Sequence, residues 1–212
     1  IWAFITLFFR DFHKIGNHIS HLALYLVCVL GANFVQGMVI LPLLLLGKKV
    51  SPVKLFKGMF PALSIGFFTK SSAAALPAAI RCMESSVGVK PRVARFSLPL
   101  CTTINMNGCA AFILISVLFV SMSEGMTYTF PEMLLWIVLA TIAAVGNAGV
   151  PMGCYFLTSA FLAAMGVPLH LLGVILPFYS LIDMVETALN VWSDACVTAL
   201  VDREVCVHYG TA

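Results

Sequence analysis

Three long stretches without a formal charge constrain the fold of this chain more than any other feature. Residues 15–47, 96–123 and 133–182 contain no Lys, Arg, Asp or Glu. An α-helix rises about 1.5 Å per residue, so about 20 apolar residues cross the ~30 Å hydrocarbon core of a bilayer. Each stretch is therefore long enough to span a membrane, and the chain is predicted to be an all-α membrane protein in a lipid bilayer.

Composition supports this prediction and excludes other classes. Apolar residues make up 61% of the chain and charged residues 10%, against about 25% charged in soluble domains. The net charge of +3 comes from short segments between apolar blocks, so no nucleic acid partner is expected. No nucleophile-base pair or phosphate loop is present, which predicts no enzyme activity and no cofactor. The seven cysteines lack a metal-binding spacing and are interpreted as small apolar fillers.

Two of the charge-free stretches predict helices that cross the membrane. Residues 21–47 predict one complete span, and residues 92–123 predict a second that is broken at a polar cluster around Asn105 and Asn107. The chain opens on an apolar run at Ile1, so residues 1–13 are expected to be the end of a further span in a fragment that begins inside it.

Two segments predict re-entrant hairpins, with apolar arms too short to cross the bilayer. In residues 131–166 the arms flank a Gly/Pro turn at 146–151, and in residues 51–88 they flank residues 70–74. Lys and Arg lie on both sides of 51–88 but are missing near Glu124, so the positive-inside rule predicts that the hairpins enter from opposite faces. Their tips would then meet near the midplane, as in transporter binding sites.

A polar stripe lies along the last predicted helix, residues 168–204. Asp183, Glu186, Thr187, Asn190 and Asp194 follow one another at helical offsets of 0, 3, 4, 7 and 11, which places them on one face. Acids inside a membrane helix are costly and usually mark an ion or substrate pathway. Two alternatives stay open: the acids lie at a helix end in water, or Glu186 is a protonated, packed side chain.

Polar residues at the interruptions complete the candidate site. Ser71 and Ser72 could offer hydroxyls and amides to a carboxylate, or form a plain serine turn. Lys70 is interpreted as a structural pairing residue. A helix broken at Asn105 exposes carbonyls that can coordinate Na+, although a simple polar kink is an equal alternative.

Four segments resemble one known family, the dicarboxylate/amino acid:cation symporters with the glutamate transporter fold. They are TKSSAAALP at 69–77, LPLCTTINMNGCA at 98–110, AAVGNAGVP at 143–151 and DMVETALNVWSD at 183–194. The ETALN...D pattern is most similar to the bacterial serine/threonine:Na+ symporter branch. The resemblance makes residues 1–13, 21–47, 92–123 and 168–204 the fifth to eighth spans. It implies a multi-pass inner-membrane protein, a homotrimer and an elevator mechanism.

The resemblance also implies roles for individual residues, with Na+ as the coupling ion. For an amino acid substrate it implies contacts from Ser71, Ser72, Val150, Pro151, Gly153, Asp183, Glu186, Thr187 and Asn190. For Na+ it implies ligands from Thr103, Asn105, Ala144, Val145, Asn147, Asn190 and Asp194.

Two departures from the family pattern change the expected substrate and ions. Glu186 stands where members selective for acidic substrates carry Arg, so a small neutral amino acid is expected. Asn107 stands where many members place an Asp that ligates Na+, so fewer coupled sodium ions are expected. The alternatives are a proton- or Na+-coupled dicarboxylate or acidic amino acid symporter, and, from another class, a channel or structural membrane protein.

Overall fold

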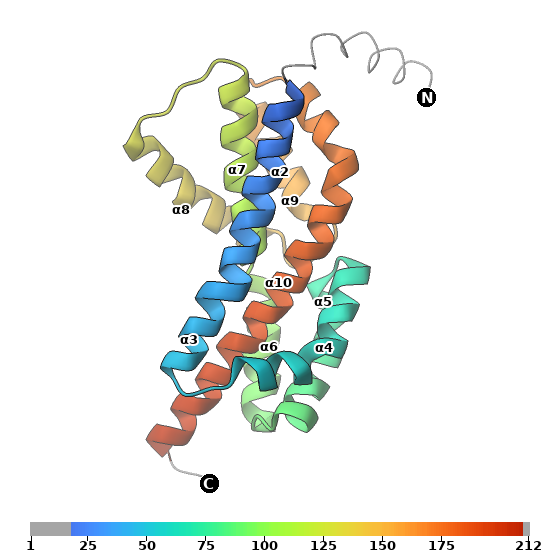
Figure 1. Cartoon of the computed structure of the whole chain (residues 1–212), viewed down its shortest axis with the longest axis vertical. Coiled ribbons are helices and arrows are strands. Elements are labelled where there is room, and N and C mark those ends of the chain that lie inside the picture. Colours follow the sequence, from blue (N-terminus) through green and yellow to red (C-terminus); the bar gives the residue numbers. More distant parts are fainter. Residues whose placement is uncertain (1–17, 210–212) are drawn as a thin grey trace.

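The computed structural model describes residues 18–209, and this part of the chain is helical without strands (Figure 1). The predicted all-α fold is confirmed, whereas the prediction for residues 1–13 lies outside the described residues. Within them, three helical segments are long and apolar enough to cross a membrane: His21–Gly47, Pro91–Ser123 and His170–Val207.

The first of these segments is nearly continuous. It consists of α2 (His18–Val35), a π-helical turn (Gln36–Ile40) and α3 (Leu41–Gly47). Pro42 lies at the start of α3, where the missing N–H is tolerated because the preceding turn already departs from α-helical hydrogen bonding.

The segment predicted as the first hairpin forms two helices packed on each other. These are α4 (Pro52–Thr69) and α5 (Ser72–Cys82), and α5 continues into a π-helical turn (Met83–Val87). Ser51 and Ser71 cap the two helices by accepting hydrogen bonds from backbone N–H groups. Lys70 ends α4 in the left-handed conformation with a φ of 55°, so the chain reverses within two residues.

The charge-free stretch after residue 96 is divided by a backbone break. Helix α6 (Pro91–Ile104) stops before Asn105, and α7 (Asn107–Ser123) begins after Met106. Next come α8 (Phe130–Gly146) and α9 (Gly153–Ala164), which both pack on α7. Where the arms approach each other, the rings of Trp136 and Phe161 meet edge to face at 5.5 Å. Whether either hairpin is re-entrant in a bilayer stays a prediction.

Helix α10 (His170–Tyr209) runs almost the whole length of the described structure (Figure 1). It contributes residues to two apolar clusters. One cluster contains α4, α5 and the C-terminal part of α10, and the other contains α2, α7, α9 and its N-terminal part. The predicted polar stripe begins where the N-terminal cluster ends and continues alongside the other cluster, so apolar side chains surround it.

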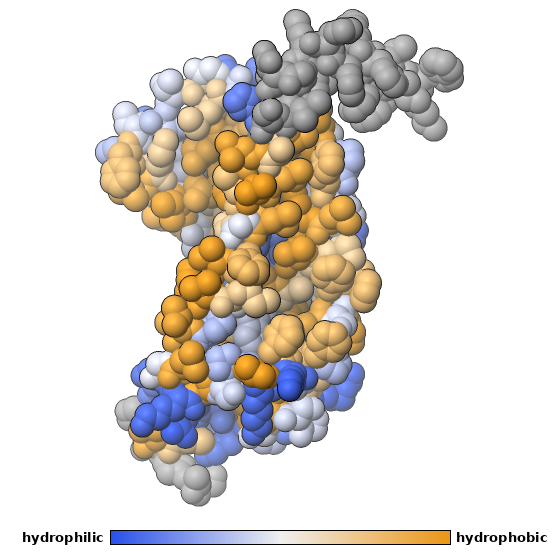
Figure 2. Space-filling view, viewed as in Figure 1, coloured by the Kyte–Doolittle hydropathy of each residue, from blue (hydrophilic) through white to orange (hydrophobic). Residues whose placement is uncertain are grey.

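Polar residues gather at one end of the molecular surface, below a broad apolar band (Figure 2). At that end Lys48 bonds to Glu204 at 2.6 Å, and Arg95 donates two hydrogen bonds to Glu84 at 2.7 and 3.2 Å. The Arg95 guanidinium holds the pKa of Glu84 below its usual value, because it stabilises the ionised carboxylate. Exposed pairs of this kind contribute little stability, but they mark where the chain meets water.

Candidate functional site

The predicted acidic stripe is buried in the middle of α10. Asp183, Glu186 and Asp194 expose 4%, 0% and 2% of their surface, and Thr187 and Asn190 are also buried. The alternative that these acids lie in water at a helix end is therefore wrong. Because charge is costly to bury without compensation, the surroundings of each carboxylate decide what it can bind.

Asp194 lies beside the break between α6 and α7. Its two carboxylate oxygens accept hydrogen bonds from Asn105 Nδ2 at 3.0 Å and from Thr102 Oγ1 at 3.4 Å. None of the ion pairs among the described residues involves Asp194. A buried carboxylate with two polar neighbours and no protein cation is suited to a metal cation.

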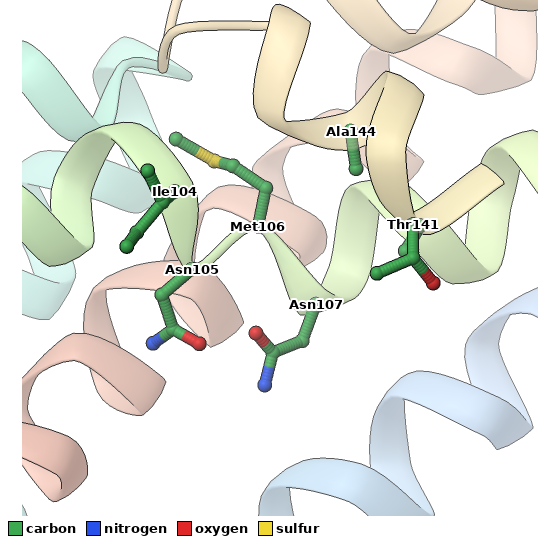
Figure 3. A pocket seen from close by; sticks show the side chains of 7 residues that line it. Ile104, Asn105, Met106, Asn107, Thr141 and Ala144 are labelled. Carbon is green, nitrogen blue, oxygen red and sulfur yellow. The ribbon is translucent and has the colours of Figure 1, made fainter. Parts of the chain in front are cut away.

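The side chain of Ser193 connects both amides of the break to α10. Its Oγ accepts hydrogen bonds from Asn105 Nδ2 and Asn107 Nδ2, each at 2.9 Å. The two asparagines point to the same side of the break, while Ala144 approaches from α8 (Figure 3). Sequence reasoning included Thr102 in the polar cluster but assigned no site role to it or to Ser193, although each is adjacent to a predicted residue.

The two hairpin tips reach α10 one turn apart, the second at Asp183 and the first at Ser180. Its Oδ2 accepts a hydrogen bond from Met152 N at 3.2 Å, and Ser71 Oγ donates to Gly149 O at 3.1 Å, which joins the tips directly. Ser72 is buried at the start of α5. Lys70 does pair structurally, but with Ser180 Oγ at 3.2 Å. A small ligand between these groups would meet a carboxylate on one side and hydroxyls or amides on the other.

Asn190 joins α10 to the first turn of α7. Its Oδ1 accepts a hydrogen bond from Gly108 N at 2.9 Å. A Cβ at Gly108 would lie 3.1 Å from both Cα and O of Glu186, so the two helices meet here backbone to backbone.

The site also contains two cysteines that sequence reasoning assigned to apolar filling. Asn147 Nδ2 donates to Cys109 Sγ at 3.1 Å and to Cys154 Sγ at 3.4 Å, and Asn190 Nδ2 donates to Cys109 Sγ at 3.3 Å. Both thiols are buried in an apolar cluster, as the filler interpretation expects, and they accept these hydrogen bonds as well. Cys109 could have been included in the site because it follows Gly108 in the chain. Cys154 is distant in the sequence, and only the fold brings it close to Cys109.

The predicted second sodium site is assembled less completely. A cavity of about 320 Å³ lies between the break and α8 and is lined by Ile104, Asn105, Met106, Asn107, Ala110, Thr141 and Ala144. The Thr103 side chain is exposed and donates to Pro99 O in its own helix. The carbonyls of Ala144 and Val145 accept hydrogen bonds from the following turn.

Three predicted substrate positions lie in or next to the second tip. Val150 and Pro151 have exposed side chains, and Gly153 begins α9 at half-buried depth. Only their backbone groups could face a ligand beside Asp183. The structure thus brings the α10 stripe, the first tip and the 105–108 break together, and leaves the Thr103 and Val150 side chains outside.

The fold and this buried polar centre are those of a helical membrane protein. The chain belongs to the sodium:dicarboxylate symporter family, whose model matches residues 1–204. This confirms the resemblance drawn from the four segments, and the family and the relatives below are transporters, not enzymes.

Relatives with two kinds of substrate in their names are similar to this chain. It is 34% identical over 190 residues to the putative sodium-dependent excitatory amino acid transporter glt-4 of Caenorhabditis elegans, covering 89% of this chain and 38% of the relative. It is also 34% identical over 182 residues to the rat neutral amino acid transporter B(0), covering 85% and 33% respectively. The human transporter of that name is 31% identical over 196 residues, covering 92% and 36%. The chain thus spans between 33% and 38% of the length of these relatives.

Proposed function

We propose that the protein containing this chain is a Na+-coupled symporter of a small neutral amino acid such as serine or threonine. It acts in the inner cell membrane as a homotrimer, and the described helices carry the solute across by an elevator movement. Sodium and amino acid symport fit the family description and the names of the relatives, which include both neutral and excitatory amino acid transporters.

The observation that carries the neutral substrate is the position of Glu186. This carboxylate is fully buried, one turn along α10 from Asp183, and none of the ion pairs among the described residues includes it. An acidic substrate side chain here would meet a second carboxylate in a medium of low dielectric, which is strongly unfavourable. A hydroxyl could instead donate a hydrogen bond to Glu186.

The remaining proposed roles are those that the family resemblance implies, and the burial of these residues on α10 supports them. Asp183 binds the substrate amino group, Thr187 and Asn190 contact the substrate, and Ser72 with the second tip surrounds its carboxylate. Asp194 with carbonyls at Asn105 and Asn190 forms one sodium site, and the cavity beside Ala144 belongs to a second.

The number of coupled ions is proposed to be lower than in glutamate-specific relatives. Asn107 donates its amide N–H to Ser193. A hydrogen-bond donor therefore occupies the position where many family members have the Asp that ligates a further Na+.

A second candidate function is a proton-coupled carrier of the same fold. It is favoured by the absence of a hydrogen-bond partner for either Glu186 oxygen among the described residues, which suits a carboxylic acid that gains and loses a proton. A steep pH dependence of uptake at saturating Na+ would support this candidate over the first.

The test is uptake of serine, threonine, alanine and aspartate by the full-length protein in proteoliposomes, with and without a Na+ gradient. Wild type is expected to prefer the neutral substrates, and Glu186→Arg is expected to shift the preference toward aspartate. Glu204→Gln, on the surface of the same helix, serves as the control and should keep the wild-type order. A wild-type preference for aspartate, or unchanged selectivity in Glu186→Arg, would contradict the proposal.

A further inference from the structure

Two cysteines to which the proposed function gives no role, Cys109 and Cys154, form a compact group of metal-ligating atoms with Glu186, the proposed selectivity residue. One oxygen of Glu186 and the two Sγ atoms all lie within 4.8 Å of one another. The three residues come from α7, α9 and α10 and expose 3%, 1% and 0% of their surface. Thiolate and carboxylate are both common ligands of Zn2+ and related cations.

We propose that these three side chains form a site for a soft divalent cation, with Zn2+ or Cd2+ as the ions that fit it. Zinc-sulfur bonds are about 2.3 Å long, so two sulfurs around one tetrahedral ion lie roughly 3.8 Å apart. The distances between the three ligand atoms exceed that spacing by at most about 1 Å, and small side-chain rotations would close the difference.

Unsatisfied polar atoms around the group point to a ligand. Neither oxygen of Glu186 has a hydrogen-bond partner among the described residues, and the same holds for Asn147 Oδ1. Buried polar atoms without partners are costly, and a cation satisfies several at once. Rotation of the Asn147 amide about its last bond would turn Oδ1 toward the sulfurs, which it now faces with Nδ2, and would supply a fourth ligand.

The surrounding hydrogen bonds suit a metal-bound thiolate. Asn190 Nδ2 donates to Cys109 Sγ at 3.3 Å, and a thiolate is a better acceptor than a thiol. Such outer partners orient the ligands of a metal site and stabilise their charge. The Asn190 amide is itself held by Gly108 N, so its orientation is fixed.

The bound ion would inhibit transport, an expectation that rests on the proposed function. Cys154 lies on α9 next to the second tip, so an ion shared with Cys109 and Glu186 ties that tip to α7 and α10. It also occupies the space beside Glu186 where the substrate side chain is proposed to lie. Inhibition by Cd2+ is therefore expected to weaken as the concentration of serine rises.

The test combines direct binding with transport, using the purified full-length protein. Cd2+ added in detergent is expected to produce the ultraviolet absorbance of a cadmium-thiolate bond with one ion per chain, and to raise the melting temperature. In proteoliposomes, Cd2+ should inhibit Na+-dependent uptake competitively with substrate. Cys109→Ser and Cys154→Ser should each raise the inhibitory concentration at least tenfold, and the double variant should lose the absorbance. Cys82→Ser, a buried cysteine in the other apolar cluster, should behave as wild type.

The two readouts separate this inference from the proposed function. Absorbance that is lost in the double variant supports the metal site even if no amino acid is taken up. Na+-dependent uptake without the absorbance, or absorbance that survives in the double variant, overturns the site and leaves the transporter standing. Size-exclusion profiles that match wild type show that each serine variant is folded. Glu186→Gln removes the carboxylate ligand while both thiols stay intact, so it tests the site independently of the cysteine substitutions.

Discussion

At the scale of single residues, Asp194 is the most direct test of the sodium site. Asp194→Asn removes the buried negative charge beside Thr102 and Asn105 but keeps the shape of the side chain. We expect the Na+ concentration for half-maximal uptake to rise at least tenfold, because a neutral amide holds a cation less well. The measurement is Na+-dependent serine uptake by the full-length protein.

Glu204→Gln is the matched control for Asp194→Asn. It changes an acid on the same helix that is paired with Lys48 at the surface. Sodium affinity should be unaltered there. If Asp194→Asn keeps the wild-type sodium dependence, the cation does not bind at this carboxylate.

The sequence could predict one half of the site and not the other. Helical offsets alone place Asp183, Glu186, Asn190 and Asp194 on one face, because periodicity is a local property. The burial that makes them functional, and the approach of Cys154 from α9, depend on contacts between distant segments. Cys154 looks like an apolar filler in the sequence because its neighbours along the chain are mainly apolar.

At the scale of elements, one hydroxyl forms a hydrogen bond between the two hairpin tips. Ser71 Oγ caps α5 by accepting from Ala74 N and also donates to Gly149 O. Ser71→Ala should cost the cap about 1 kcal/mol and release the second tip. We expect faster amide hydrogen exchange at residues 147–152, measured by mass spectrometry.

Ser51→Ala is the control that distinguishes the loss of a helix cap from the loss of the hydrogen bond between the tips. Ser51 caps α4 in the same manner, through Lys54 N at 3.4 Å, but lies far along the chain from the tip. Its loss should leave exchange at 147–152 unaltered. Equal exchange in both variants would show that the Ser71 hydroxyl does not hold the second tip.

The close approach of α7 and α10 gives a second test at this scale. Gly108→Ala would place a methyl group 2.9 Å from Asn33 Oδ1 and 3.1 Å from the Glu186 backbone. We expect a loss of about 1–3 kcal/mol in stability and a lower melting temperature in detergent. Gly31→Ala meets no atom within 4 Å in the described structure, so helix propensity should make that control neutral or slightly stabilising.

The ends of several helices have local causes in the sequence, whereas the packing of α8 and α9 has none. Ser51, Ser71 and the prolines at the starts of α4 and α6 mark helix ends chemically. The arrangement of α8 and α9 does not follow from such signals. Both arms pack on α7, and that choice depends on which apolar faces meet in three dimensions.

At the scale of the whole molecule, the surface divides into an apolar band and a charged end (Figure 2). Pairs such as Lys48–Glu204 and Arg95–Glu84 lie at that end, while Glu124 pairs with His170 at the opposite one. Lys and Arg are retained on the cytoplasmic side of membrane proteins because their transfer across the bilayer is disfavoured. The charged end is therefore expected to face the cytoplasm.

The orientation is tested by labelling single introduced cysteines in intact cells. Thr127→Cys lies in the exposed loop before α8, and Arg92→Cys lies in the exposed first turn of α6. A membrane-impermeant maleimide should label Thr127→Cys in intact cells, and Arg92→Cys only after permeabilisation. The unmodified full-length protein measures the background from the native thiols. The reverse pattern would mean that the molecule has the opposite orientation in the membrane, with the first hairpin on the outer face. Equal labelling of both positions would mean that they lie on one side and that the helices between them do not cross the membrane.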